Sequence, residues 1–477
     1  MKPESLTVPV DGPFVSVARY GEAYRKGARP IHPTADTDAL RQAFCVPLPE
    51  APTPADEVIA SLIAAAEPGL VGNTDPNFFA WVMGGSSLVG VTADMLTSIW
   101  GQNAAIYQTA PAAAIAEEAV SAWLLDLLDL PRRASVGFVT GATMASFVGL
   151  AAARSDVLRR AGHDYEADGL QGAPRVRVFL SDDAHIANFV SLRYLGFGDA
   201  NVCRIPSDEL GLMSPEALRA AMAEFHGPKI VVAQAGHINS GSFEDFVAIA
   251  DISRGHNAWL HVDGAFGLWA RVLPEKAPLT DGLELADSWS VDGHKWLQIP
   301  YDSGFAIVRN AEAHRRAMGN AAGYLNLLAT DGRNPSDHNP ELSRRARGFA
   351  AWAVLRSLGA EGVRALVAGH CRAATRAASQ LSDLPGLALA RLPDLNQIVL
   401  QPLEPCRDGE SLTDRLAAEL NAMHGVFVRP ADWKGRRVLR LSFVTGGTGQ
   451  AEADALAAAI RAAWARIHPS SPGRIHR

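Results

Sequence analysis

The sequence is poor in the features that mark secreted proteins and metal-cluster proteins. It has only 4 cysteines in 477 residues. Cys45, Cys203, Cys371 and Cys406 lie far apart and form no CxxC pair, which excludes a paired-cysteine zinc site and argues against a disulfide framework. We therefore expect reduced thiols in a cytoplasmic protein, and the sequence predicts no metal site.

Long apolar runs and an excess of positive charge are also missing. No run approaches the ~18 consecutive apolar residues of a membrane span. The N-terminal residues carry charge early and lack the apolar segment of a signal peptide. Lys and Arg number 44 against 51 for Asp and Glu, which gives a formal charge of −7 and no basic stripe for nucleic acid. We expect neither a membrane nor a nucleic acid as a partner.

The overall composition is that of an ordinary globular protein. Apolar residues make up 48% and charged residues 20%, which is enough apolar material for a large core. Residues 1–75 are rich in Pro and Ala and show one helical stretch, 54–66, without a core of their own. We assign residues 1–75 to an N-terminal arm, 76–360 to a large α/β domain and 361–477 to a smaller α+β domain.

Strand and helix patterns alternate between residues 135 and 310. The strand candidates are short and apolar or β-branched, and helical or turn segments separate them, which favours a mostly parallel sheet covered by helices. In such sheets ligands gather at the carboxyl ends of the strands. Residues 329–341 are polar, with Gly, two Pro and two Asn, and predict a mobile loop. The predicted strands are 136–140, 176–180, 230–234, 259–263, 288–292 and 304–308.

A lysine directly follows the predicted strand 288–292. Lys295 stands between His294 and Trp296, where loss of water would favour the neutral, nucleophilic amine that Schiff-base formation requires. The alternative is a surface lysine that ends a strand. For a single lysine this plainer interpretation is the more common one.

Polar or small residues follow other predicted strands. Asp263 ends the strand 259–263 and can hold a protonated pyridine nitrogen, while the small Ala265 would let a flat ring approach. Gly141, Ala142 and Thr143 open a helix after the strand 136–140, where backbone N–H groups can bind a phosphate. Taken alone, Asp263 could equally cap a turn. A Gly-Ala-Thr sequence between a strand and a helix is also common, so by itself it is weak evidence for a phosphate site. No GxGxxG and no Walker A motif stands there.

Two further segments hold candidate ligand-binding residues. His185, in SDDAHIAN, could stack on a cofactor ring and carry protons, or could simply start a helix. Asn239, in AQAGHINSGSF, could hydrogen-bond a ring substituent from a glycine-containing turn.

These segments, in this order and spacing, resemble the group II pyridoxal-phosphate-dependent amino-acid decarboxylase family of fold type I. That family includes aromatic-amino-acid, tyrosine, histidine and glutamate decarboxylases. The HKW of residues 294–296 and the HVDGAF of residues 261–266 carry the resemblance, which extends from Pro76 (PNFFAWV) to the C-terminal WKGRRVLRLSF. It implies pyridoxal 5'-phosphate as the cofactor and an amino acid as the substrate.

The resemblance also implies a fold, an assembly and residue roles. The fold would be the fold type I transferase fold, with a seven-stranded, mostly parallel sheet, a smaller C-terminal domain and an N-terminal helical arm. The protein would be a homodimer whose two active sites lie at the interface, with the arm swapped over the partner. The implied cofactor contacts are an internal aldimine on Lys295, Asp263 at the pyridine nitrogen, His185 and Ala265 on the two ring faces, and Gly141, Ala142, Thr143, Asp292 and His294 around the phosphate.

The expected reaction is decarboxylation of an L-amino acid, with aromatic substrates favoured, to the amine and CO2. Aligned on PELSRRARGF, His338 stands where aromatic decarboxylases have a loop tyrosine that supplies a proton. His338 could supply that proton, could divert the reaction to O2 with an aldehyde, ammonia and peroxide as products, or could be only a polar loop residue. Transamination or carbon–carbon lysis would share Lys295 and Asp263. A further alternative is a cofactor-binding scaffold without turnover. The intact Lys295 and Asp263 argue against it, because such a protein has no need to keep a desolvated lysine beside an acid.

The substrate pocket of the family would include Trp81, Val82 and Asn103. Trp81 keeps one aromatic wall, Ala105 removes another, and Asn103 adds polarity. The aromatic residues of this region could equally belong to the core. Arg440, on a predicted strand, is a candidate for a carboxylate contact or a structural residue.

Overall fold

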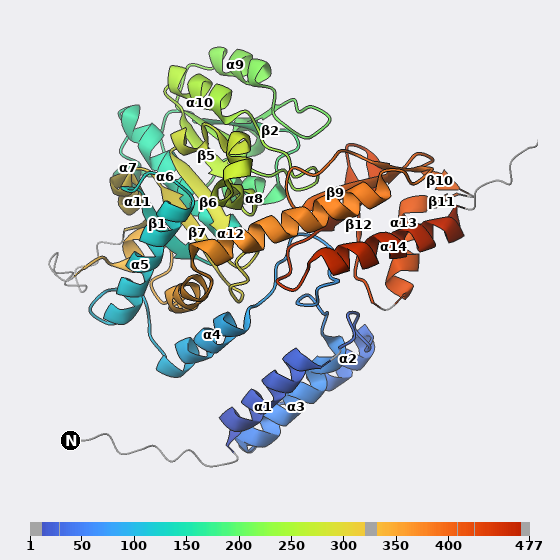
Figure 1. The fold of residues 1–477 in the computed structure, drawn as a ribbon. Helices are drawn as coiled ribbons and strands as arrows, with labels where there is room; N and C mark the ends of the chain where they lie inside the picture. Colours follow the sequence, from blue (N-terminus) through green and yellow to red (C-terminus); the bar gives the residue numbers. More distant parts are fainter. Residues whose placement is uncertain (1–11, 28, 320–331, 408, 424, 469–477) are drawn as a thin grey trace, which may run out of the picture.

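The computed structural model describes residues 12–27, 29–319, 332–407, 409–423 and 425–468. Its centre is a seven-stranded sheet, and a four-stranded sheet forms the C-terminal part. Helix α12 (Gly348–Leu381) runs across the molecule and joins the two parts (Figure 1). It changes direction at Gly359, whose φ of 60° lies in the left-handed region. Over the described residues, no helix is long and apolar enough to cross a membrane.

The strands of the large sheet follow the order β1-β7-β6-β5-β4-β2-β3. Strands β3, β2, β4, β5 and β6 pair in parallel, and β7 is antiparallel to both of its neighbours. This confirms the predicted α/β fold with a mostly parallel seven-stranded sheet. The strands are β1 (Ser135–Val139), β2 (Arg177–Ser181), β3 (Val202–Ile205), β4 (Lys229–Gln234), β5 (Trp259–Asp263), β6 (Ser288–Asp292) and β7 (Gly304–Val308).

The strand β3 was absent from the predicted set. It lies at the edge of the sheet, and of its four residues only Ile205 is buried. An edge strand needs no continuous apolar run, so its sequence, VCRI, lacks the signal that identified the inner strands.

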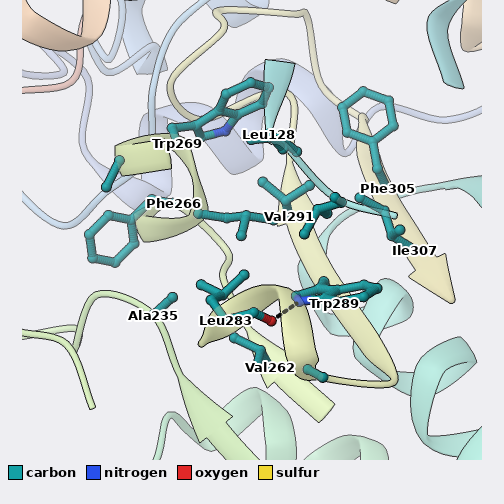
Figure 2. Packing of buried hydrophobic residues seen from close by; sticks show 14 of the residues in the cluster. Leu128, Ala235, Val262, Phe266, Trp269, Leu283, Trp289, Val291, Phe305 and Ile307 are labelled. Atoms are coloured by element: carbon teal, nitrogen blue, oxygen red, sulfur yellow. Dashed lines mark hydrogen bonds between the residues drawn. The ribbon is translucent and has the colours of Figure 1, made fainter. Parts of the chain in front are cut away.

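Helices cover both faces of the large sheet, and alternate residues of a strand enter different cores. Phe305 and Ile307 of β7 face one core, whereas Ala306 and Val308 face the other. Figure 2 shows the first core, in which the indole N–H of Trp289 donates to the Leu283 carbonyl at 2.9 Å. The helices between residues 88 and 318 are α4 (Leu88–Trp100), α5 (Pro111–Leu127), α6 (Ala142–Arg160), α7 (Tyr165–Asp168), α8 (Ile186–Tyr194), α9 (Pro215–Ala223), α10 (Phe246–Gly255) and α11 (Ala311–Met318).

The C-terminal part is an antiparallel sheet with helices on one side. Its strand order is β12-β13-β9-β8, and α13, α14 and the second half of α12 share a core with it. The elements are β8 (Leu387–Leu389), β9 (Gln397–Pro402), β10 (Cys406–Arg407), β11 (Glu410–Ser411), α13 (Leu412–Ala422), β12 (Pro430–Trp433), β13 (Arg436–Ser442) and α14 (Gln450–Ile467).

Three N-terminal helices project from the body of the molecule (Figure 1). They are α1 (Pro13–Lys26), α2 (Thr37–Phe44) and α3 (Ala55–Ala66). Within these described helices no residue is buried, although α3 carries the apolar residues Val58 and Leu62. The arm is anchored between α1 and α2, where the buried Ile31 packs with Phe78 and Phe427.

Candidate active site

Lys295 lies in the turn after β6 and forms an ion pair there. Its Nζ is 3.0 Å from Oδ2 of Asp292, and its side chain is 17% exposed. The other oxygen of Asp292 accepts the backbone N–H of Ala142 at 2.5 Å and lies 3.4 Å from Nε2 of His294. The His294 ring stacks on Tyr301, and burial lowers the pKa of His294. Asp292 therefore joins the lysine to the start of α6.

Asp263, at the end of β5, is held in a fixed orientation. It is 7% exposed. Its Oδ2 accepts from Nδ2 of Asn188 at 2.8 Å, and its Oδ1 accepts from the Ala265 N–H at 3.2 Å and from Oγ of Ser290 at 3.4 Å. A buried carboxylate with these donors is preorganised to pair with a cation.

His185 forms the N-cap of α8. Its backbone N–H donates to Oε1 of Gln234 at 2.8 Å, and its Nδ1 accepts the Ala187 N–H at 3.3 Å. Because Nδ1 accepts, the proton of the neutral ring sits on Nε2. Burial lowers the pKa of His185, and the neighbouring Asp263 acts in the opposite direction.

These residues line one cavity at the carboxyl ends of the strands. Gly236, with a φ of +81°, forms part of the wall, and a Cβ there would come within 3.1 Å of the Phe266 ring. The lining residues are His185, Gln234, Gly236, Ile238, Asp263, Ala265, Phe266 and Lys295. The sequence predicted four of them, His185, Asp263, Ala265 and Lys295.

The start of α6 has the shape of a phosphate-binding turn. A Cβ on Gly141 would come within 2.9 Å of the His294 ring and 3.2 Å of the Asp292 carboxylate, so only glycine fits there. The first amide that closes a turn of α6 is that of Ala145, so the Thr143 amide precedes the intrahelical hydrogen bonds. A lysine, a buried carboxylate and this helix start fit the three functional ends of pyridoxal phosphate, namely its aldehyde, ring nitrogen and phosphate.

Asn239 lies outside the cavity lining, against the sequence-based expectation. Its Oδ1 accepts from Nη1 of Arg440 at 3.2 Å, and the same guanidinium donates to the Ile238 carbonyl. The neighbouring Ile238 lines the cavity instead. Arg440 therefore holds this turn in place, which matches the structural alternative considered for it.

The three predicted substrate-pocket residues also lie outside the lining of this cavity. Val82 is buried and belongs to the main core. Trp81 is 45% exposed, with its ring 6.1 Å from that of Phe427. Asn103 is exposed, and its Oδ1 accepts the backbone N–H of Arg344 at 3.1 Å. The described chain therefore brings none of the three into contact with the cavity beside Lys295.

Where the structure describes it, the loop predicted at 329–341 is irregular apart from one short turn, but His338 is buried within it. Residues Pro335–His338 form a short 3-10 helix, and His338 is 8% exposed. Its ring meets that of His314 edge-on at 5.0 Å, and its Nδ1 accepts from Nε of Arg333 at 3.3 Å. Burial and the Arg333 charge lower the pKa of His338 well below its ordinary value. The remainder of the predicted loop, residues 329–331, lies outside the described residues.

We expect His338→Tyr to destabilise the fold and to leave the reaction products unchanged. The larger ring would meet His314 and lose the Arg333 hydrogen bond, and overpacking of this kind costs about 1–3 kcal/mol of unfolding free energy. Urea denaturation measures the loss, with His226→Tyr at an exposed position as the control. A changed product ratio at unchanged stability would contradict this prediction and would indicate that His338 takes part in the reaction.

Comparison with known proteins points to one family. The family model described as the pyridoxal-dependent decarboxylase conserved domain matches residues 38–398. The chain is 30% identical over 343 residues to an aromatic-L-amino-acid decarboxylase of Bacillus atrophaeus, which covers 70% of this chain and 68% of that protein. It is 27% identical over 412 residues to phenylacetaldehyde synthase of Arabidopsis thaliana, with 82% of each chain covered.

A solved structure shows the same fold over nearly the whole chain. The crystal structure of Oryza sativa TDC with PLP and tryptamine matches with a TM-score of 0.87 and 24% sequence identity, covering 96% of this chain and 99% of that one. With the family match, this confirms the predicted fold type I architecture. The chain therefore belongs to the pyridoxal-dependent decarboxylase family and is a pyridoxal-phosphate-dependent amino-acid decarboxylase.

Proposed function

We propose that this enzyme decarboxylates an aromatic L-amino acid to its amine, with Lys295 as the lysine that binds the cofactor covalently. The observation that carries the proposal is the single cavity shared by Lys295, Asp263 and His185. Of the other lining residues, Phe266 and Ile238 are apolar and Gln234 is polar but uncharged, which suits an apolar substrate side chain better than an acidic one. The similarity to an aromatic-L-amino-acid decarboxylase supports the same substrate class.

Each residue would have a separate task. Bound pyridoxal phosphate supplies an electron-accepting ring for the electron pair left at the α-carbon when CO2 departs. The Lys295 amine would hold the cofactor between turnovers and release it to the substrate. Asp263 would keep a proton on the ring nitrogen, and the Asn188 and Ala265 donors hold that carboxylate in its orientation.

The remaining residues would position the cofactor. His185 would pack on one face of the ring and Ala265 on the other. Gly141, Ala142 and Thr143, with Asp292 and His294 beside them, would hold the phosphate end. The hydrogen bond from the His185 backbone N–H to the Gln234 side chain holds the backbone of His185 at the cavity.

A panel of L-amino acids with the cofactor-loaded enzyme tests the proposal. We expect release of an aromatic amine, detected by mass spectrometry, without peroxide. An acidic or diamino substrate converted in preference to the aromatic ones would contradict the proposed substrate class.

Oxidative decarboxylation to an aldehyde is the second candidate. The similarity to phenylacetaldehyde synthase over 412 residues favours it. The same panel separates the two reactions, because the aldehyde product appears together with ammonia and peroxide.

We also propose that the enzyme works as a homodimer with shared active sites. Helices α4, α5 and α12 form an apolar groove whose residues include Leu96, Trp100, Ile115 and Trp352, each between 40% and 49% exposed. Patches of this kind mark protein interfaces. A second copy would cover the groove, and its arm helices α1–α3, which bury no residue in the described chain, would find their partner surface there.

We expect Ile115→Arg to weaken the dimer and to reduce activity with it. A charge placed in the centre of an interface costs at least about 2 kcal/mol of association free energy, or roughly 30-fold in Kd. Sedimentation velocity over a range of protein concentrations measures the shift, with Val247→Arg, an equally exposed apolar residue on α10, as the control. A wild-type protein that sediments as a monomer, or an Ile115→Arg variant that remains a fully active dimer, would contradict this assembly.

A further inference from the structure

Gln298 lies three residues after Lys295 and uses its whole side-chain amide. Its Nε2 donates to the Lys295 carbonyl at 2.9 Å and to the Val444 carbonyl at 2.5 Å. Its Oε1 accepts the backbone N–H of Gly446 at 3.1 Å. Gln298 is 5% exposed and has a φ of +58°, a left-handed conformation that few residues other than glycine adopt. A conformation of this kind persists where surrounding contacts hold it.

A second hydrogen-bond chain connects the lysine turn to the same C-terminal segment. The indole N–H of Trp296, the residue after Lys295, donates to Nδ1 of His370 at 2.9 Å, and Nε2 of His370 lies 2.9 Å from the Thr445 carbonyl. Because Nδ1 accepts, Nε2 carries the proton and donates. Burial lowers the pKa of His370 to about 4, so this ring is neutral.

The segment before α4 closes over Gln298 from the other side. The Ser87 N–H donates to the Gln298 carbonyl at 2.8 Å. A Cβ on Gly84 would come within 2.3 Å of the Lys295 carbonyl, and one on Gly85 would come within 2.5 Å of Oε1 of Gln298. The lysine turn is therefore packed between this segment and the turn Val444–Gly446, which follows β13.

We propose that Gln298 is a positioning residue for Lys295. Its hydrogen bonds fix the backbone of Lys295 relative to the turn Val444–Gly446. The inference rests on the proposed covalent role of Lys295. The Gln298 amide touches both the Lys295 carbonyl and the two ends of this turn. A shift of the C-terminal sheet relative to the large sheet would therefore move the backbone that carries the reactive amine.

Two substitutions separate the hydrogen bonds from the backbone conformation. Gln298→Glu keeps the size but replaces both N–H donors with an oxygen that faces two carbonyls. Gln298→Asn suits the left-handed conformation better than glutamine, yet its amide is one methylene too short to reach Val444. Gln450→Glu, the same chemical change at an exposed helix start, is the control.

Hydrogen exchange of the apoenzyme gives a readout that needs neither cofactor nor turnover. We expect faster exchange of the peptide containing Gly446 in both Gln298 variants and not in the control. In the loaded enzyme we expect kcat to fall about 10–100-fold with little change in KM, because small displacements of a reacting group have effects of this size. The pH dependence of the absorbance of the covalently bound cofactor should shift as well.

Failure of the positioning role and failure of the proposed function give different experimental results. A cofactor still fixed by borohydride in Lys295→Ala would overturn the assignment of the lysine itself. If Lys295→Ala loses that link while Gln298→Asn matches the control in kcat and in the pH dependence of the absorbance, the positioning role alone is overturned. Faster exchange at Gly446 with unchanged kcat and absorbance would also overturn it, because Gln298 would then be only structural.

Discussion

Lys295→Ala is expected to abolish turnover and the covalent link to the cofactor. The substitution removes the amine that would form the bond and also the cation that faces Asp292 at 3.0 Å. Because the covalent link would be the route by which the cofactor is held and passed to the substrate, we expect its loss to reduce turnover to background. Reduction with borohydride followed by peptide mass spectrometry should find the cofactor on residue 295 in the wild type and on no peptide of the variant.

The control for this experiment is Lys276→Ala, a lysine on a 3-10 helix that does not line the cavity beside Lys295. It should keep both the activity and the link. Appreciable turnover in Lys295→Ala, or a cofactor attached to another lysine, would remove Lys295 from the proposed mechanism.

Asp263→Ala is expected to lower kcat by about 10²–10³-fold, the range for the loss of one preorganised electrostatic partner. Without the carboxylate, the ring nitrogen of the cofactor would lose its proton at neutral pH, and the ring would accept electrons less well. A cofactor analogue methylated at the ring nitrogen carries this positive charge permanently. The analogue should therefore restore part of the activity of Asp263→Ala.

Asn188→Ala is the matched control for Asp263→Ala, because it removes the 2.8 Å hydrogen bond and leaves the carboxylate in place. Both variants break this bond and should lose similar stability, about 1–3 kcal/mol for a buried partner left unsatisfied. Only Asp263→Ala should respond to the methylated analogue. An Asp263→Ala variant with nearly full activity and the natural cofactor would contradict the proposed ion pair.

The inner strands and the residues that follow them were predictable from the sequence. Strands β5, β6 and β7 have the predicted bounds, and every residue in them is buried, although β5 and β6 also contain polar residues such as His261 and Ser290. Asp263 ends β5, and Lys295 follows the adjacent strand β6. His185 follows β2 on the far side of β4, so a parallel sheet brings all three to one edge. The edge strand β3 lacked this signal.

The turns were harder to predict, for reasons visible in particular residues. The prediction selected Asn239, whereas its neighbour Ile238 lines the cavity, and the direction of this turn depends on left-handed glycines at 236 and 241. His338 was placed by alignment across a long polar segment, and the structure buries it against His314. Gln298 belongs to no motif, and its importance follows only from contacts with residues almost 150 positions away.

The course of α12 bears on how the protein unfolds. Its first half and the residues just beyond Gly359, such as Val363 and Val367, belong to the core of the large sheet, while Ala374 and Leu381 belong to the core of the C-terminal sheet. A cut at the predicted boundary of 360–361 would remove buried side chains from the large core and expose them on the other fragment. The two cores share one helix, so we expect them to melt in a single linked transition rather than as independent units.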